Sequence, residues 1–326
     1  MTGSESRTPV AQPESNPQLP RRLAIATILA LVLVFILATG LMRTGAGNAS
    51  GPALSGTPST RAATRKTLRI ATLNIHSGVG RDGRRDLDRT AQALRGFDIV
   101  ALNEVRGTSL FGGQDQAHFL AQKLAIPCLF APAERQWWHD SFGNAVLCNM
   151  PVTHWNRNPL PGSFGRGYKN IVTLRLPFAG RNLTVLVTHI DRQKDRESQL
   201  RIVVDRFLEA ELPAILLGDF NTRADDVLFR ALLASAPPSP GPFAPVAPPP
   251  RPARGPTPGS APFPPAVAPL WTSGLVPSPA IDPFPPQDSP DRVDWILLRG
   301  LKCRDAGIID TPASDHPLLW VEVEPP

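Results

Sequence analysis

The sequence predicts an α/β protein in which two mixed β-sheets pack together with helices outside them, preceded by one transmembrane helix. Apolar runs rich in Val, Ile and Leu alternate with segments of helical periodicity from residue 67 onward. Several runs in mid-chain follow one another through short turns, which indicates antiparallel neighbours and therefore mixed sheets. An uncharged apolar run near the N-terminus is long enough to span a bilayer.

This apolar run covers residues 23–42, and the predicted anchor covers 21–43. At about 1.5 Å per residue, a helix of that length spans the roughly 30 Å hydrocarbon layer. The alternative is a cleaved signal peptide, whose apolar region is usually about 7–15 residues long. Small residues at Gly47 and Ala49 keep cleavage open as an alternative.

Basic residues flank the apolar run unevenly. Arg21 and Arg22 lie directly before it, whereas after Arg43 no basic residue occurs until Arg61. The positive-inside rule then predicts a single-pass protein of the cell membrane, with a short cytoplasmic N-terminus and an extracytoplasmic domain. Residues 1–20 are predicted to be a disordered tail, and residues 44–66 a flexible tether.

Strands and helices are predicted in alternation within the domain at residues 67–326. Asp86 is a candidate N-cap for the first of its helices. The predicted strands are 68–75, 99–102, 145–148, 171–176, 183–188, 214–217, 293–298 and 318–323, and the predicted helices are 87–95, 116–125, 196–211 and 225–233.

A proline-rich insert interrupts this domain at residues 237–290. It contains 21 of the chain's 38 prolines. No helix or central strand tolerates that density, because proline lacks a backbone N–H and fixes φ. The insert is expected to be either a passive surface excursion or a binding segment for a partner protein.

The charge of the chain lies mainly in its N-terminal part. The formal net charge is +6, but residues 67–326 contain 27 basic and 26 acidic residues. A nearly neutral domain argues against a broad nucleic-acid-binding face, since phosphate neutralisation supplies much of such affinity. A local basic patch around Arg81, Arg84 and Arg85 stays open. The three cysteines have no metal-ligand spacing and form no even disulfide framework.

Five short polar motifs each follow an apolar run. They contain Asn74, Glu104, His189, Asp219 with Asn221, and Asp315 with His316. Cleaving a phosphoester requires an activated water, a cation and stabilisation of the charge that develops, and these residue types can supply all three. Each motif alone could be structural. Five in this order indicate a metal-dependent phosphoester-cleaving site.

Asp294 lies inside an apolar strand pattern and therefore needs a polar partner. His316 can be that partner, and an Asp–His pair would fix the tautomer of the imidazole. Arg166 and Lys169, in a Gly-rich stretch, could contact substrate or could only solvate a loop.

The ordered motifs resemble those of the endonuclease/exonuclease/phosphatase superfamily, which includes pancreatic-type deoxyribonuclease, abasic-site endonucleases, neutral sphingomyelinases and inositol polyphosphate 5-phosphatases. The resemblance rests on Thr72-Leu73-Asn74, Asn103-Glu104-Val105, Gly143-Asn144-Ala145, Thr188-His189, Gly218-Asp219-Phe220-Asn221, Arg292-Val293-Asp294 and Ser314-Asp315-His316. It implies a four-layer α/β sandwich with the site at one edge of two facing sheets.

The resemblance also implies metal-binding residues. Glu104 would be the principal metal carboxylate, with Asn74 and Asp315 completing the site. The expected cofactor is Mg²⁺, with Mn²⁺ as a possible substitute, because one or two carboxylates with waters and phosphate oxygens suit these ions. Asn103 departs from the glutamine that many relatives have before the metal glutamate.

Catalytic roles follow from the resemblance in the same way. Asp219 would orient or deprotonate the attacking water, and Asn221 would help to position the phosphate. His316 would bind the scissile phosphate while Asp294 orients it. His189 would contact a non-bridging oxygen or assist the leaving group, and Asn144 would contact the phosphate.

These observations predict a monomeric, membrane-anchored phosphodiesterase or phosphatase acting on a phospholipid headgroup or a small phosphoester. The alternative is an extracytoplasmic Mg²⁺-dependent endonuclease or exonuclease, with nucleic acid as the phosphoester substrate. A third hypothesis, a non-catalytic tethered binding module, predicts the loss of at least one site residue, and the sequence retains them all.

Overall fold

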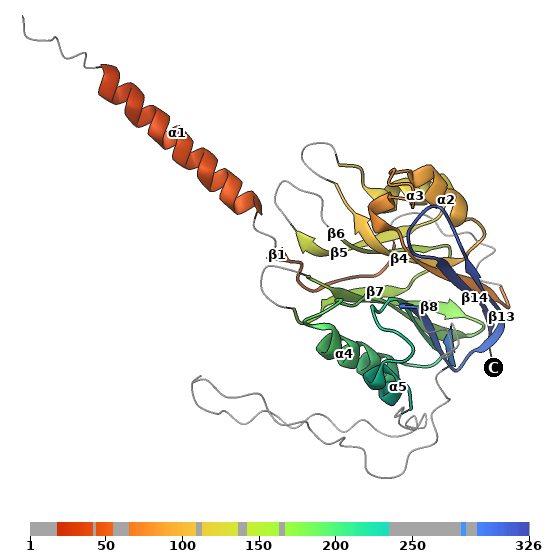
Figure 1. The fold of residues 1–326 in the computed structure, drawn as a ribbon. Helices are drawn as coiled ribbons and strands as arrows, with labels where there is room; N and C mark the ends of the chain where they lie inside the picture. Colours follow the sequence, from red (N-terminus) through yellow and green to blue (C-terminus); the bar gives the residue numbers. More distant parts are fainter. Residues whose placement is uncertain are drawn as a thin grey trace, which may run out of the picture. The chain divides into compact units, whose positions relative to one another are not determined.

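A computed structural model describes residues 18–41, 44–54, 65–108, 113–135, 142–162, 167–234, 282–284 and 292–325 (Figure 1). The chain divides into two compact units, residues 1–42 and 43–326, which are considered separately. Most of the proline-rich insert predicted at 237–290 lies outside the described residues.

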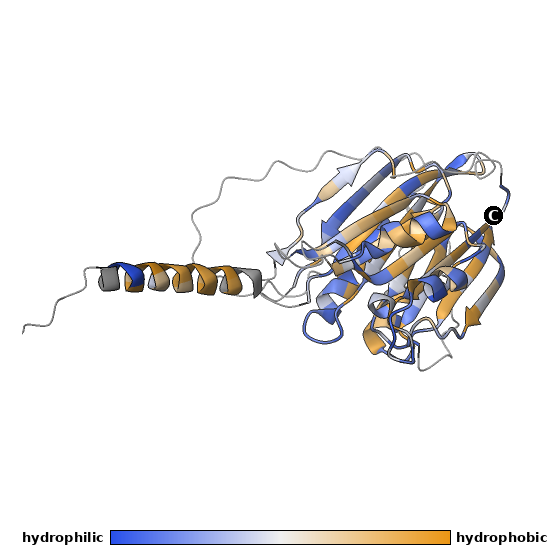
Figure 2. Cartoon of the chain, turned by 90° about the horizontal axis from the view of Figure 1, so that it is seen from above, coloured by the Kyte–Doolittle hydropathy of each residue, from blue (hydrophilic) through white to orange (hydrophobic). Residues whose placement is uncertain are grey.

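The first unit contains helix α1 (Gln18–Leu41), which covers most of the segment for which the sequence predicts a transmembrane helix. The side chains of its leucine, isoleucine and valine residues between 23 and 37 are exposed, and the helix is predominantly apolar (Figure 2). Among the described residues, no helix is both long and apolar enough to cross a membrane, so the transmembrane helix stays a prediction.

The second unit contains two seven-stranded mixed sheets, as the sequence predicts. The first sheet has the order β1-β5-β6-β4-β3-β14-β13. Its strands are β1 (Thr44–Gly45), β5 (Cys128–Arg135), β6 (Phe142–Cys148), β4 (Ile99–Arg106), β3 (Leu68–Asn74), β14 (Leu318–Glu324) and β13 (Lys302–Ile309). A short 3-10 helix, η2 (His76–Gly78), follows β3.

The second sheet has the order β11-β12-β10-β9-β8-β7-β2. Its strands are β11 (Asp282–Phe284), β12 (Asp294–Arg299), β10 (Ala214–Asp219), β9 (Arg181–His189), β8 (Asn170–Phe178), β7 (His154–Pro159) and β2 (Ala49–Gly51). Among the strand pairs of the described residues, β3–β4 and β9–β10 are parallel and the others antiparallel, so both sheets are mixed.

Side-chain alternation along the strands builds the layers. On β10, Ile215 and Leu217 point into the core between the two sheets, whereas Ala214 and Leu216 point to the opposite face. Helices α4 (Arg196–Glu209) and α5 (Val227–Ala234) cover that outer face.

The other sheet has the same organisation. Leu68 and Ile70 of β3 enter the inter-sheet core, and Ala71 and Leu73 face helices α2 (Leu87–Ala93) and α3 (Gln116–Leu124). The two helix pairs lie on opposite sides of the paired sheets (Figure 1). The four-layer α/β sandwich is therefore confirmed.

The predicted tether differs from the structure in its first part. Residues 44–51, expected to be flexible, contribute β1 to the edge of one sheet and β2 to the edge of the other. Ala46 between them is 3% exposed, and buried Arg157 donates from Nε and Nη2 to the carbonyl oxygen of Gly47 at 3.2 and 2.7 Å. Residues 55–64 of the predicted tether lie outside the described residues.

Strands β5, β7 and β13 are also absent from the sequence-based prediction. Strand β13 is mostly exposed and lies at a sheet edge, so its sequence lacks an alternating apolar pattern. Strand β7 consists mostly of polar residues and also lacks an alternating apolar pattern. Strand β5 was missed although most of its residues are buried.

Candidate active site

The site lies at one end of the inter-sheet core, where inward-facing positions change from apolar to polar. On β10, the inward series Ile215 and Leu217 ends in Asp219, and on β9 the series Val185 and Val187 ends in His189. Asn74 ends the corresponding series on β3. Because side chains alternate between faces with period two, these polar residues must point into the same space.

Strand pairing brings three of these residues into one row of the second sheet. Asp219 on β10 is in register with Asp294 on β12 and with His189 on β9. Asn74 reaches across from the other sheet and donates from Nδ2 to Oδ2 of Asp219 at 3.0 Å. The predicted site residues therefore meet where the two sheets face each other.

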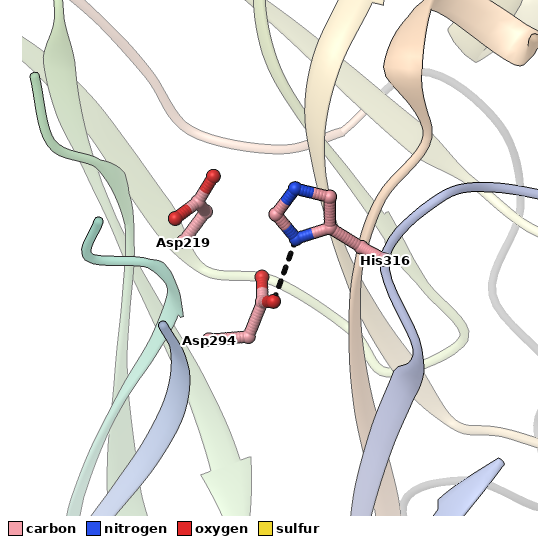
Figure 3. Close-up of side chains that lie close together, drawn as sticks. All are labelled: Asp219, Asp294 and His316. Atoms are coloured by element: carbon pink, nitrogen blue, oxygen red, sulfur yellow. Dashed lines mark hydrogen bonds and ion pairs between the residues drawn. The ribbon is translucent and has the colours of Figure 1, made fainter. Parts of the chain in front are cut away.

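Asp294 and His316 form the hydrogen-bonded pair that the sequence predicts. Nδ1 of His316 donates to Oδ2 of Asp294 at 2.7 Å, and Asp219 lies beside the ring (Figure 3). Burial acts to lower the pKa of His316, but the hydrogen bond and charge of Asp294, with the charges of Asp219 and Asp315, outweigh it and raise this pKa to about 9. His316 is therefore a cation at neutral pH.

Asp219 is a carboxylate held in an unfavourable environment. Burial, followed by repulsion from Asp294, raises its pKa to about 6, although His316 and the bonds from Asn221 and Asn74 oppose the shift. Burial likewise raises the pKa of Asp294. A carboxylate of this kind is suited to accept a proton near neutral pH.

The backbone around Asp219 is held in uncommon conformations. Gly218 has φ 140°, and a Cβ there would lie 1.9 Å from the carbonyl oxygen of Thr188. Asn221 has φ 46°; its backbone N–H donates to Oδ1 of Asp219 at 2.8 Å, and its Nδ2 donates to the carbonyl oxygen of Ile190 at 2.8 Å. The backbone N–H of Asn221 therefore supports the carboxylate of Asp219, while the Asn221 side chain is held by Ile190.

His189 is almost completely buried and has two polar neighbours. Its Nε2 lies 2.9 Å from Nζ of Lys169 and 3.6 Å from Oδ2 of Asp219. Burial, followed by the charges of Lys169 and His316, lowers the pKa of His189 well below its usual value. His189 is thus a neutral imidazole in this site.

Asn144, expected to contact the phosphate, lies instead beneath the site. It is 1% exposed, and its amide is engaged at both ends: Oδ1 accepts from Nδ2 of Asn103 at 2.8 Å, and Nδ2 donates to Oδ1 of Asn170 at 2.9 Å. A buried amide with both ends satisfied has little capacity left for substrate. Its position makes Asn144 part of the support for the site.

Asn103 connects the two sheets below the site. Its Nδ2 also donates to the carbonyl oxygen of Thr188 at 2.9 Å, and its Oδ1 accepts from the backbone N–H of Asp219 at 2.9 Å. Although Asn103 is shorter than the glutamine of many relatives, both ends of its amide have hydrogen-bond partners.

Glu104 is well placed to bind a cation. It lies at a register shift between β4 and β6 with φ 58°, and bulges of this kind redirect a side chain. Its partly buried carboxylate makes no hydrogen bond or ion pair with any residue in the part of the chain that the structure describes. An unpaired half-buried carboxylate and the amide oxygen of neighbouring Asn74 are oxygen donors that fit Mg²⁺ or Mn²⁺.

Asp315 lies at the rim, where its side chain is 57% exposed and its Oδ1 is 3.5 Å from Nδ1 of His76. Among the described residues, the one cluster of three possible ligand side chains is Asp219, Asp294 and His316, with ligand atoms within 4.8 Å of one another. A protonated His316 is a poor metal ligand, so Glu104 and Asn74 are the better candidates.

Two residues contribute to the site without having been given a definite role from the sequence. Ser314 donates from Oγ to the carbonyl oxygen of Asn74 at 2.5 Å and accepts from the backbone N–H of His316 at 3.2 Å, which ties the last motif to β3. Lys169 is the second. Both lie next to recognised motif positions in sequence or space, but neither type of residue is diagnostic by itself.

Comparison with known proteins agrees with this geometry. The sequence model of the Endonuclease/Exonuclease/phosphatase family matches residues 71–316, so the chain belongs to this family. Family members are metal-dependent phosphoester hydrolases, and the protein is an enzyme of that type. None of the curated proteins matches the chain.

Solved structures of low sequence identity share the fold. An endonuclease/exonuclease/phosphatase from Beutenbergia cavernae DSM 12333 is 21% identical over 80% of this chain and 72% of its own, with a TM-score of 0.57. A Leptotrichia buccalis C-1013-b family protein is 15% identical over 79% and 99%, with a TM-score of 0.54. The human Nocturnin catalytic domain is 15% identical over 86% and 98%, with a TM-score of 0.51.

Proposed function

We propose that this protein is a Mg²⁺-dependent phosphodiesterase or phosphatase that acts on a phospholipid headgroup or a small phosphoester. The observation that supports this most directly is the cluster of Asp219, Asp294 and His316, in which a carboxylate suited to accept a proton lies beside an imidazolium. These are the two charges that hydrolysis of a phosphoester requires from side chains.

Some of these residues act on the attacking water and others act on the phosphate. Asp219 accepts a proton from the attacking water, while Asn74 and the backbone of Asn221 hold its carboxylate in place. The His316 imidazolium stabilises negative charge on a phosphoryl oxygen. Asp294 keeps His316 protonated and oriented, since it accepts the Nδ1 proton and leaves the other ring nitrogen for substrate.

Glu104 and Asn74 would hold Mg²⁺, with Asp315 at the rim as a further carboxylate. The ion supplies neutralisation of phosphate charge when bound. Asp315 can take part through a water, which suits its exposed position.

The overall charge of the domain favours a small phosphoester or a headgroup over duplex DNA. Residues 67–326 are nearly neutral, with 27 basic and 26 acidic residues. Binding of a long duplex normally requires a basic face that neutralises several phosphates.

Membrane attachment through residues 21–43 is part of the same proposal, with the domain outside the cytoplasm. Its support is the sequence of the segment and the exposed apolar side chains of α1. A helix that exposes this many leucine, isoleucine and valine side chains would be stabilised by an apolar environment.

The test uses the full chain with Mg²⁺ on three substrates: mixed phosphatidylcholine and phosphatidylglycerol vesicles, bis(p-nitrophenyl) phosphate and supercoiled plasmid. We expect headgroup release or diester cleavage that EDTA abolishes and that His316→Ala reduces by at least about 100-fold. Plasmid nicking that both controls abolish, without the other activities, would identify a nuclease. No hydrolysis of any phosphoester by a folded chain would reject the proposed function.

A further inference from the structure

Lys169 lies inside the active site and has no part in the mechanism described above. It directly precedes β8, and its carbonyl oxygen accepts from the backbone N–H of Leu160 at 2.9 Å. The next residue, Asn170, is held by Asn144 and donates from Nδ2 to the carbonyl oxygen of Ala131 at 3.0 Å. The backbone on both sides is therefore anchored, which restricts where the partly buried side chain can point.

The hydrogen bond between Lys169 and His189 has a definite direction. An ammonium group has only donors, so Nζ of Lys169 donates and Nε2 of His189 accepts at 2.9 Å. The proton of the neutral imidazole is then on Nδ1. With its Nε2 lone pair occupied by the lysine, His189 cannot donate from this nitrogen to a phosphate oxygen or a leaving group.

The ammonium of Lys169 lies close to the groups that act on the phosphate. Burial lowers the pKa of Lys169, and the charges of Asp219, Glu104, Asp191 and Glu134 act in the opposite direction. In the described part of the chain, His189 is the hydrogen-bond partner of Nζ, and two of its three N–H donors remain for a ligand. The site thus contains a second basic side chain near the carboxylates assigned to water and metal.

We propose that Lys169 is a catalytic residue that binds a non-bridging oxygen of the scissile phosphoryl group, and that His189 is the positioning residue that directs its ammonium. This inference rests on the proposed function. It transfers to Lys169 the phosphate contact that the sequence assigned to His189. The alternative is that Lys169 only neutralises Asp219 and Glu104 and never contacts substrate.

The two roles differ in what a substitution changes. Loss of a phosphate contact weakens phosphate binding and turnover but leaves Mg²⁺ binding nearly unchanged. Loss of a neutralising charge makes the site more negative, which strengthens Mg²⁺ binding and lowers stability without a direct effect on phosphate. Measuring inorganic phosphate and Mg²⁺ binding separately therefore distinguishes them.

The experiment compares full-length Lys169→Met and Lys169→Arg with Lys302→Met, which removes the same charge from an exposed position on β13. We expect Lys169→Met to lower kcat/KM for bis(p-nitrophenyl) phosphate about 10²- to 10³-fold and to weaken inorganic phosphate binding at least about tenfold. Lys169→Arg should restore part of both, and Lys302→Met should change neither. The Mg²⁺ concentration for half-maximal activity should stay within about twofold.

His189 variants test the positioning role. His189→Gln keeps an oxygen that can accept from Lys169, whereas His189→Leu does not, so we expect phosphate binding to be retained better in the first variant. Equal loss in both would show that His189 acts on substrate itself and would overturn its assignment. If the wild-type chain is active and Lys169→Met binds phosphate normally, only the Lys169 inference fails. A wild-type chain without any activity would reject the proposed function and the catalytic role together.

Discussion

Asp219 and His316 have raised pKa values for different physical reasons, and the difference determines how the enzyme should depend on pH. Asp219 is raised to about 6 mainly because burial disfavours its charged form. His316 is raised to about 9 because neighbouring carboxylates, above all Asp294, outweigh the opposing effect of burial. Between these values, Asp219 is a carboxylate and His316 is an imidazolium, which is the combination that the mechanism requires.

The first prediction is a bell-shaped dependence of kcat/KM on pH. Activity should rise as Asp219 loses its proton near pH 6 and fall as His316 loses its proton near pH 9. Saturating Mg²⁺ should shift the acid limb below 6, because a nearby cation favours the carboxylate. Steady-state kinetics with bis(p-nitrophenyl) phosphate at fixed Mg²⁺ would measure both limbs.

Asp294→Asn tests the cause of the alkaline limb. Removing this charge should move that limb from about 9 toward 6.5, the usual value for histidine, and lower activity at pH 8 by about 30-fold. Asp305→Asn, an exposed change on β13, should leave the profile as it is. An alkaline limb that stays near 9 in Asp294→Asn would show that another group titrates there.

At the scale of elements, the edge strands β1 and β2 are held by close contacts of single residues and not by an alternating apolar pattern. A Cβ at Gly51 would lie 2.7 Å from Nε1 of Trp155, whereas a Cβ at Gly47 would have no atom within 4 Å. Both glycines belong to the same segment, but only Gly51 is packed against an indole. The segment therefore docks through particular residues, and these can be tested one at a time.

The second prediction concerns this docking. Gly51→Ala should lower the free energy of unfolding by about 1–3 kcal/mol, since the added methyl group displaces Trp155 or the strand. Gly47→Ala should change it by no more than about 0.5 kcal/mol. Urea unfolding of the two variants compares them directly. Equal stability of both would mean that β2 does not pack against Trp155 as the structure shows.

These edges also show what the sequence can and cannot predict. Strands such as β3, β9 and β10 were predictable because one or both faces are buried and apolar, and their ends located Asn74, His189 and Asp219. Strands β1 and β2 have only two and three residues in a Gly/Ser-rich segment, which is too short for any period to appear.

The candidate site was likewise predictable only where the residue pattern itself requires a contact. Asp294 and His316 could be paired from sequence because a carboxylate in an apolar strand needs a partner. The burial of Asn144 beneath the site and the bond from Lys169 to His189 could not be predicted, because both depend on contacts across strands that residue type does not specify. Family resemblance identified which residues meet, but not which of them face substrate.

At the scale of the whole molecule, the segment after α1 is part of the folded domain. Thr44–Gly45 pairs with β5 and Ala49–Gly51 pairs with β7, so residues that follow the predicted anchor complete both sheets. Cleavage near Gly47 or Ala49, as a signal peptide would require, would remove β1 and expose the edge of a sheet, which proteins generally protect. This arrangement favours an N-terminus that is retained.

The last prediction separates the two units. A chain that starts at Thr44 keeps β1 and β2, so it should fold and hydrolyse bis(p-nitrophenyl) phosphate with kcat/KM within about twofold of the full chain. Only membrane association should be lost, because residues 21–43 are the proposed anchor.

After expression, the full chain should remain in the membrane fraction through a carbonate wash and be released by detergent, whereas the shortened chain should be in the supernatant. Intact mass would verify that the N-terminus is present. A full chain with an intact N-terminus in the supernatant would contradict the anchor but leave the hydrolase assignment unaffected, since the site lies entirely within residues 44–326.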